Sequence, residues 1–164
     1  MTKTGKILTL PLARRIRDHL AHTGATVGLC HGCFDILHHG HVHYLAQAAA
    51  QVDVLVVSVT AARHIDKGAG RPVFDDRART SVVAALGMVD YVVISDAPTA
   101  VAVIRELRPD LYFKGADYRG AADPRLDAER AALADAGGAY VLTDDRVSDS
   151  STRAARVLLG AEGQ

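Results

Sequence analysis

Apolar and polar positions along this chain follow two alternating patterns. Short runs of apolar and β-branched residues predict five strands, at 25–30, 53–60, 91–95, 111–115 and 139–143. The run at 53–60, DVLVVSVT, is almost continuously apolar and β-branched, which is typical of a central parallel strand. Longer stretches have helical spacing, as shown by Leu12, Ile16 and Leu20, and they cover 11–22, 40–51, 78–89, 98–108, 125–137 and 151–160.

Strand and helix therefore alternate five times after a leading helix. This order predicts an α/β fold: a single Rossmann-like three-layer domain over residues 1–164, with a five-stranded parallel sheet between helices. In open sheets of this kind, ligands bind beyond the carboxyl ends of the strands. We therefore expect the functional residues in four loops, at 31–41, 61–75, 115–123 and 144–152.

Charge narrows the range of partners. Lys and Arg total 19 and Asp and Glu total 19, so the net charge is zero. That balance argues against a nucleic-acid-binding surface and against a polybasic membrane anchor. No apolar run is long enough to span a bilayer, and no signal-peptide pattern opens the chain. We expect a cytoplasmic protein that acts on small molecules.

Histidines are concentrated in one loop. Five of the eight lie between residues 31 and 43, and residues 32–41 spell G-C-F-D-I-L-H-H-G-H between a predicted strand and a helix. Backbone N–H groups at a helix N-terminus favour an anion. Gly32 allows a sharp turn, and Gly40 allows close approach of a phosphate. His38 and His41 flank Gly40, so both rings can donate hydrogen bonds to the same polyphosphate.

The H-x-G-H sequence after G-x-F-D resembles the cytidylyltransferase-like nucleotidyltransferases. The resemblance implies that His38 and His41 are catalytic and contact a nucleoside triphosphate. It also implies that the nucleotide lies along Gly32, Cys33, Phe34, Asp35 and Gly40. The expected reaction is direct in-line attack of an acceptor oxygen on the α-phosphorus, with release of pyrophosphate.

Three further segments are similar to the same family. K-G-x-G-R-P-V followed by an arginine resembles the heptose-phosphate adenylyltransferases, which implies a catalytic Lys67 and phosphate contacts from Lys67, Arg71 and Arg79. K-G-x-D-Y implies nucleotide contacts from Lys114, Gly115 and Asp117 and an acceptor contact from Tyr118. S-S-T near the last predicted helix implies phosphate contacts from Ser150, Ser151 and Thr152, although a serine there can equally be a simple N-cap.

The resemblance is specific for the reaction class and less so for the substrates. The order of motifs is also similar to phosphonoformate cytidylyltransferases, so CTP is favoured, with a small phosphate or phosphonate acceptor. The alternative is ATP with a sugar 1-phosphate. Mg²⁺ is expected on the triphosphate, and Asp35 is the one motif carboxylate that could approach it. Relatives of this kind are commonly dimers, so we expect a homodimer.

Two interpretations from other classes stay open at this point. A non-catalytic nucleotide sensor is disfavoured by the intact histidine pair. Cys30 and Cys33 form a C-x-x-C sequence that could serve redox chemistry or zinc. We rank that interpretation low, because Cys30 ends an apolar strand and is expected to be buried.

Overall fold

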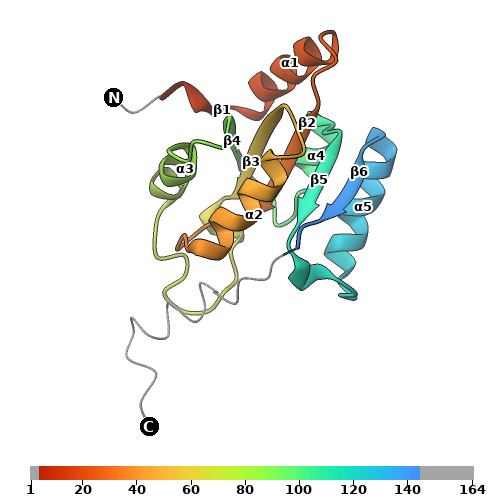
Figure 1. Cartoon of the computed structure of the whole chain (residues 1–164). Helices are drawn as coiled ribbons and strands as arrows, with labels where there is room; N and C mark the ends of the chain where they lie inside the picture. The colour runs from red at the N-terminus through yellow and green to blue at the C-terminus, as the bar shows by residue number, and fades with distance from the viewer. Residues whose placement is uncertain (1–3, 145–164) are drawn as a thin grey trace.

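The protein, seen here in a computed structural model that describes residues 4–144, is built on one parallel sheet. Six strands lie in the order β1-β4-β3-β2-β5-β6, and each adjacent pair is parallel (Figure 1). The strands are β1 (Ile7–Leu8), β2 (Val27–Gly32), β3 (Val54–Thr60), β4 (Tyr91–Ser95), β5 (Leu111–Lys114) and β6 (Ala139–Leu142).

Helices cover both faces of the sheet. Helices α1 (Leu10–Ala21), α4 (Val101–Leu107) and α5 (Pro124–Ala136) share one apolar cluster with the sheet. Helices α2 (His39–Ala49) and α3 (Asp76–Ala84) share another cluster on the opposite face. Three short 3-10 turns complete the elements: η1 (Thr4–Lys6), η2 (Ala62–His64) and η3 (Ala116–Tyr118).

The central strand β3 shows why the layers form. Leu55 and Val57 belong to the cluster beneath α2 and α3, whereas Val56 belongs to the cluster on the other face. All three side chains are buried. Because successive side chains of a strand point to opposite faces, a continuously apolar run requires a layer on each side.

The predicted Rossmann-like three-layer α/β fold is confirmed, with one difference. The sheet has six strands rather than five, because the two residues of β1 pair with β4 at one edge. An apolar pair is too short to give a periodic pattern. The predicted helix at 151–160 and the residues Ser150, Ser151 and Thr152 lie outside the described residues.

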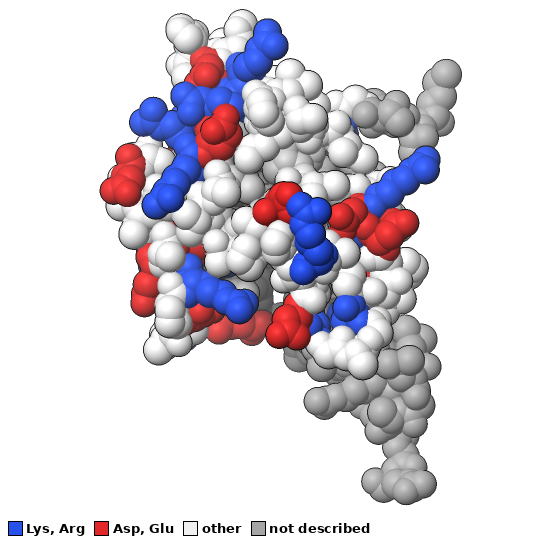
Figure 2. All heavy atoms as spheres, turned by 180° about the vertical axis from the view of Figure 1, so that it is seen from behind, with Lys and Arg blue, Asp and Glu red and all other residues white. Residues whose placement is uncertain are grey.

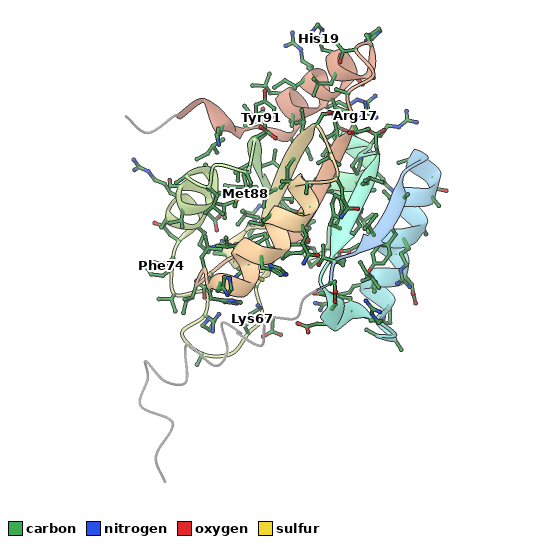
Figure 3. All side chains as sticks on the ribbon, viewed as in Figure 1. Arg17, His19, Lys67, Phe74, Met88 and Tyr91 are labelled. Atoms are coloured by element: carbon green, nitrogen blue, oxygen red, sulfur yellow. The ribbon has the colours of Figure 1, made fainter. Side chains whose placement is uncertain are left out.

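Strand order reverses at β2. The chain passes from β2 to β3 on one side and later returns to place β5 on the other side. Loops leaving the carboxyl ends of these strands therefore diverge, and a crevice forms there. Lys67, in the loop after β3, lies at this end of the molecule (Figure 3).

Two surface properties complete the description. On the face drawn in Figure 2, basic and acidic side chains are interspersed rather than gathered by sign. Within residues 4–144, no helix has the length and apolar character needed to cross a bilayer.

Candidate active site

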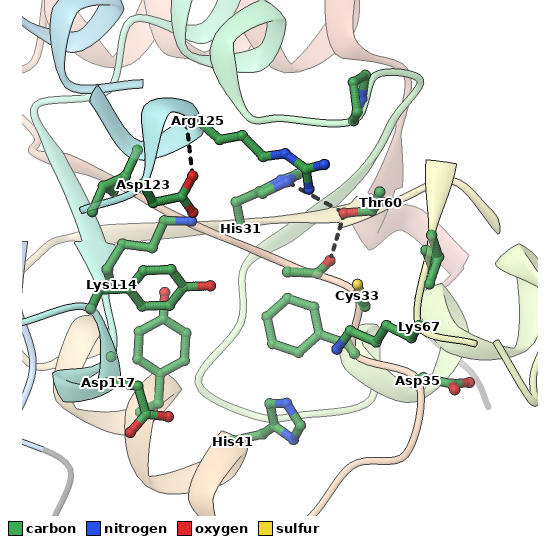
Figure 4. Close-up of a pocket in the computed structure, with 18 of the residues that line it drawn as sticks. His31, Cys33, Asp35, His41, Thr60, Lys67, Lys114, Asp117, Asp123 and Arg125 are labelled. Carbon is green, nitrogen blue, oxygen red and sulfur yellow. Dashed lines mark hydrogen bonds between the residues drawn. The ribbon is translucent and has the colours of Figure 1, made fainter. Parts of the chain in front are cut away.

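A pocket of ≈ 440 Å³ lies at the carboxyl ends of β2, β3 and β5 (Figure 4). Three of the four predicted loops line it, and the fourth, at 144–152, lies outside the described residues apart from residue 144. The residues that line it and that the sequence singled out are Gly32, Cys33, Phe34, Asp35, His38, Gly40, His41, Lys67, Lys114, Gly115, Asp117 and Tyr118. The topology thus brings together side chains that are more than 80 residues apart in the sequence.

The two motif histidines lie together at the start of α2. His38 is the N-cap residue, and its Nδ1 accepts a hydrogen bond from the Gly40 N–H at 3.1 Å. The ring centroids of His38 and His41 are 4.0 Å apart. The two rings therefore lie together at one end of the pocket, whereas the N–H groups of Gly40, His41 and Val42 already donate to His38.

His41 has an unsatisfied ring nitrogen. Its Nδ1 is buried and has no hydrogen-bond partner within residues 4–144. Burial, with smaller contributions from the nearby His38 and Lys67, lowers the pKa of His41 to about 4. The ring is therefore neutral at pH 7, and a buried polar atom of this kind gains free energy from a ligand that satisfies it.

Gly32 and Phe34 shape the loop before α2. Gly32 is the last residue of β2, and a Cβ built on it would lie 3.1 Å from the Phe34 ring. Phe34 has φ 46°, in the left-handed region that a bulky side chain rarely adopts. The glycine thus makes room for the Phe34 ring, instead of providing the sharp turn that the sequence suggested. That ring lies 5.4 Å from the His41 ring.

Asp35 joins the histidine loop to the lysine loop. Its carboxylate accepts hydrogen bonds from the N–H groups of Val73 and Phe74 and from Arg71 Nε, at 2.6 to 3.1 Å. Burial alone would raise the pKa of Asp35, but these donors outweigh it and hold the pKa below its usual value. Asp35 therefore does not fit a Mg²⁺ ligand. Within residues 4–144, no group of three His, Cys, Asp or Glu side chains is arranged to hold a metal ion.

The two arginines of the lysine loop differ from expectation. Arg71 is bonded to Asp35 and is not among the residues that line the pocket. Arg79 is 1% exposed, and its guanidinium donates to the carbonyls of Cys33, Thr60 and Phe74 and contacts Asp76. Because its donors face the interior, we correct the expected phosphate contact of Arg79 to an internal role.

Lys67 differs from the two arginines, because protein groups do not hold its side chain in the described part of the chain. It is exposed in a glycine-rich loop and lines the pocket, and Figure 4 shows its amino group directed into the cavity. No hydrogen bond or ion pair holds this amino group within the described part of the chain. The side chain is therefore available to a ligand that binds beside His41.

Lys114 is already paired. Its Nζ lies 3.1 Å from Glu129 Oε2, 4.7 Å from the centroid of the Tyr118 ring and 5.3 Å from that of Tyr112. Glu129 also accepts from Tyr112 Oη at 2.8 Å and from the Ala100 N–H at 2.9 Å. Burial would raise the pKa of Glu129, but Lys114 and the two donors hold it below its usual value. Glu129 thus neutralises Lys114 at the base of the pocket, and the sequence had not singled it out.

His31 and Thr60 form a second pair that the sequence analysis did not assign. His31 Nδ1 lies 3.1 Å from Ser58 Oγ, and its Nε2 lies 3.3 Å from Thr60 Oγ1. Burial, together with the positive charge of Lys114 and against the opposing effect of Glu129, lowers the pKa of His31 to about 4. The position of His31 at the carboxyl end of β2 was the available signal, because side chains there face the ligand crevice.

The cysteines do not have the character of a reactive pair. Cys30 is 0% exposed, and burial raises the pKa of its thiol to about 12. Both cysteines are free, and only Cys33 lines the pocket. Since the thiolate is the nucleophile and the metal ligand, the buried Cys30 is poorly suited to redox or zinc chemistry.

Comparison with known proteins agrees with this geometry. The cytidylyltransferase-like family model matches residues 29–156. The bifunctional protein HldE of Gluconobacter oxydans (strain 621H) is 39% identical over 163 residues, which is 98% of this chain and 33% of that protein. HldE of Mesorhizobium japonicum is 40% identical over 148 residues, which is 89% of this chain and 29% of that protein. The chain thus spans about a third of these relatives.

Solved structures share the fold. The lipopolysaccharide core biosynthesis protein from Thermoplasma volcanium GSS1 has a TM-score of 0.64 and 25% identity, over 76% of this chain and 100% of that one. Pantoate-beta-alanine ligase from Francisella tularensis, complexed with beta-gamma ATP and beta-alanine, has a TM-score of 0.58 and 13% identity, over 84% of this chain and 66% of that one. The second likeness concerns the fold alone. With the matched family model and the histidine pocket, these findings show that the chain belongs to the cytidylyltransferase-like family of nucleotidyltransferases.

Proposed function

We propose that this nucleotidyltransferase transfers the adenylyl group of ATP to a sugar 1-phosphate of the heptose type and releases pyrophosphate. The observation that supports the reaction is the placement of His38 and His41 at the N-terminus of α2, facing the pocket. Preorganised donors at the leaving phosphates are what phosphoryl and nucleotidyl transfer require of a protein.

The choice of substrates rests on the relatives. The sequence alone favoured CTP and phosphonoformate. The relatives named HldE and the lipopolysaccharide core biosynthesis protein instead favour the heptose branch, which the K-G-x-G-R-P-V segment also resembles. We therefore rank ATP with a sugar 1-phosphate above CTP with a phosphonate.

The reaction needs no covalent bond to the protein. An oxygen of the acceptor phosphate, already ionised at pH 7, forms a bond to the α-phosphorus. The bond from that phosphorus to the oxygen that bridges the α- and β-phosphates breaks, and pyrophosphate leaves. His38, His41 and Lys67 donate hydrogen bonds to the departing phosphates. Each such donor contributes about 3 kcal/mol to transition-state stabilisation. Mg²⁺ carried by the triphosphate belongs to the proposal, and we assign it no protein ligand. A homodimer also stays a prediction.

Pyrophosphate release tests this function. ATP and CTP would each be paired with a heptose 1-phosphate, glycerol 3-phosphate and phosphonoformate. We expect the highest kcat/KM for ATP with the heptose 1-phosphate. His41→Ala should lower kcat by about a hundredfold or more, because one donor to the transition state is lost. His39→Ala is the matched control, since His39 is exposed on the same turn and does not line the pocket.

Different experimental results would contradict the proposed substrates and the proposed role of the histidine pair. A higher kcat/KM for CTP with phosphonoformate would restore the other acceptor and nucleotide. Near-wild-type kcat in a folded His41→Ala variant would remove the role given to the histidine pair. Equal losses in the His39 and His41 variants would point to a disturbed helix instead of a lost donor.

A further inference from the structure

Two of the cations that line the pocket have no partner among the described residues. Three Lys or Arg side chains line it: Lys67, Lys114 and Arg125. Lys114 is neutralised by Glu129 at 3.1 Å. Within residues 4–144, the side chains of Lys67 and Arg125 have no hydrogen bond or ion pair. Since a cation in a concave site attracts anions, the pocket has two separate positions for phosphate groups.

Arg125 is held at the start of α5. Its backbone N–H donates to Asp123 Oδ1 at 2.9 Å, and Asp123 is the N-cap of the helix. From this fixed position the side chain extends into the pocket towards His31 and Thr60, at the end opposite His41 (Figure 4). Lys67, in the loop after β3, and Arg125, on α5, thus belong to different elements and to different parts of the cavity.

His31 and Thr60 form a polar part of the wall facing Arg125, beside the Lys114–Glu129 ion pair. His31 is uncharged at pH 7 because its pKa is about 4, and its ring nitrogens lie beside the hydroxyls of Ser58 and Thr60. The Thr60 hydroxyl also lies 3.3 Å from the Gly32 carbonyl. Within the described chain, Arg125 is therefore the one unpaired full positive charge at this end of the pocket.

In an in-line displacement, the His41 end and the Arg125 end of the pocket bind different groups. The attacking oxygen and the leaving oxygen lie on opposite sides of the α-phosphorus. Because His38, His41 and Lys67 face the leaving pyrophosphate, the attacking group enters from the opposite end. We infer that Arg125, together with His31 and Thr60, binds the phosphate of the acceptor. This inference rests on the proposed transfer to a phosphorylated acceptor.

The chemistry of Arg125 suits this role. A guanidinium offers a planar fork of donors that matches two oxygens of a phosphate monoester. The carboxylates Asp117 and Asp123 also line this pocket and can accept hydrogen bonds from hydroxyl groups. The site therefore fits a phosphate monoester attached to a polyhydroxylated body.

Steady-state kinetics of Arg125→Ala, Arg125→Lys and Arg119→Ala test the inference. Arg119 is the matched control, because it is exposed in the loop that leads to α5 and does not line the pocket. Arg125→Ala should raise the KM for the acceptor by about 10-fold or more, the usual cost of one charged hydrogen bond, with an ATP KM within about twofold of wild type. Arg125→Lys should recover part of the loss, since it keeps the charge without the fork. Arg119→Ala should behave as wild type.

The acceptor panel separates failure of the inference from failure of the proposed function. An unchanged acceptor KM in Arg125→Ala, or a selective rise in the ATP KM, would overturn the inference while transfer to the sugar phosphate stood. If wild type used only glycerol 3-phosphate or phosphonoformate and Arg125→Ala lost that acceptor selectively, the subsite would stand and the proposed sugar would fall. If no phosphorylated acceptor bound to the protein saturated with α,β-methylene-ATP, measured by calorimetry, both would be overturned.

Discussion

Charged residues in this site are buried only where the protein supplies a partner. Asp35 is surrounded by three donors, and Lys114 by Glu129 and two aromatic rings. Arg79 is enclosed by carbonyl oxygens. Isolated buried charges are too costly to persist, so these partners are what allow the three side chains to be buried. Lys67 and Arg125, which lack such partners in residues 4–144, are the cations available to substrates.

His31 allows a prediction at the same scale. Its pKa is about 4 in the folded chain and near 6.5 when unfolded, so the unfolded chain binds more protons below pH 6.5. The free energy of unfolding that the neutral His31 contributes is therefore fully present above pH 6.5. It is lost as the pH falls from 6.5 towards 4. His31 should therefore contribute a loss of up to about 2 kcal/mol in unfolding free energy between pH 7.5 and pH 5.

Urea denaturation at the two pH values measures this contribution. His31→Asn should lose less unfolding free energy on acidification than wild type does. His19→Asn, at an exposed position on α1, should lose as much as wild type. An identical pH dependence in His31→Asn and wild type would show that the imidazole is not held neutral by its surroundings.

At the scale of elements, the site depends on how irregular loops are fixed between regular ones. The segments after β2 and β3 lack long regular structure, yet they bear His38 and Lys67. Two internal clamps hold them. Asp35 binds the backbone at Val73 and Phe74. Arg79 binds the carbonyl of Cys33, which follows β2, and that of Thr60, which ends β3. Precise placement of catalytic groups on loops requires support of this kind.

Arg79 provides the test of this arrangement. Arg79→Met removes the donors to three carbonyls, of which that of Thr60 lies in a buried hydrogen bond, so the free energy of unfolding should fall by about 3–5 kcal/mol. Arg77→Met, at an exposed position on the same helix, should change it by less than about 0.5 kcal/mol. Urea denaturation distinguishes the two. A fully stable Arg79→Met protein with weakened ATP binding would instead support the phosphate contact that family resemblance implied.

At the scale of the whole molecule, the sequence could predict what is local. Runs such as 53–60 indicated buried strands, because the apolar pattern of a strand can be read within one short segment of the sequence. The histidine loop could be identified because strand, glycine, histidines and helix are contiguous. Strand order could not be predicted, since crossover lengths do not say which edge a strand joins. β1 was missed because two residues give no period.

Some residues of the site could not be predicted for the same reason, because sequence patterns reveal only local features. His31, Thr60, Arg125 and Glu129 come from β2, β3 and α5, and they meet only after the sheet has assembled. Arg79 shows the converse. Its motif position suggested a ligand contact, but its side chain faces the interior. In both cases, the direction in which a side chain points relative to the sheet determines whether it reaches the pocket. A sequence motif does not specify that direction.

Since the pocket draws residues from both sides of the strand-order reversal, ligand binding should stabilise the described fold as one unit. A ligand that binds only the folded chain adds about 2.7 kcal/mol to the unfolding free energy at a concentration of 100 times Kd. Mg²⁺ and α,β-methylene-ATP at that concentration should therefore raise the urea midpoint without changing the m-value, because the surface exposed on unfolding is the same. His41→Ala should show a smaller rise at equal ligand concentration. A changed m-value, or two separate transitions with ligand bound, would show that the nucleotide stabilises only one half of the sheet.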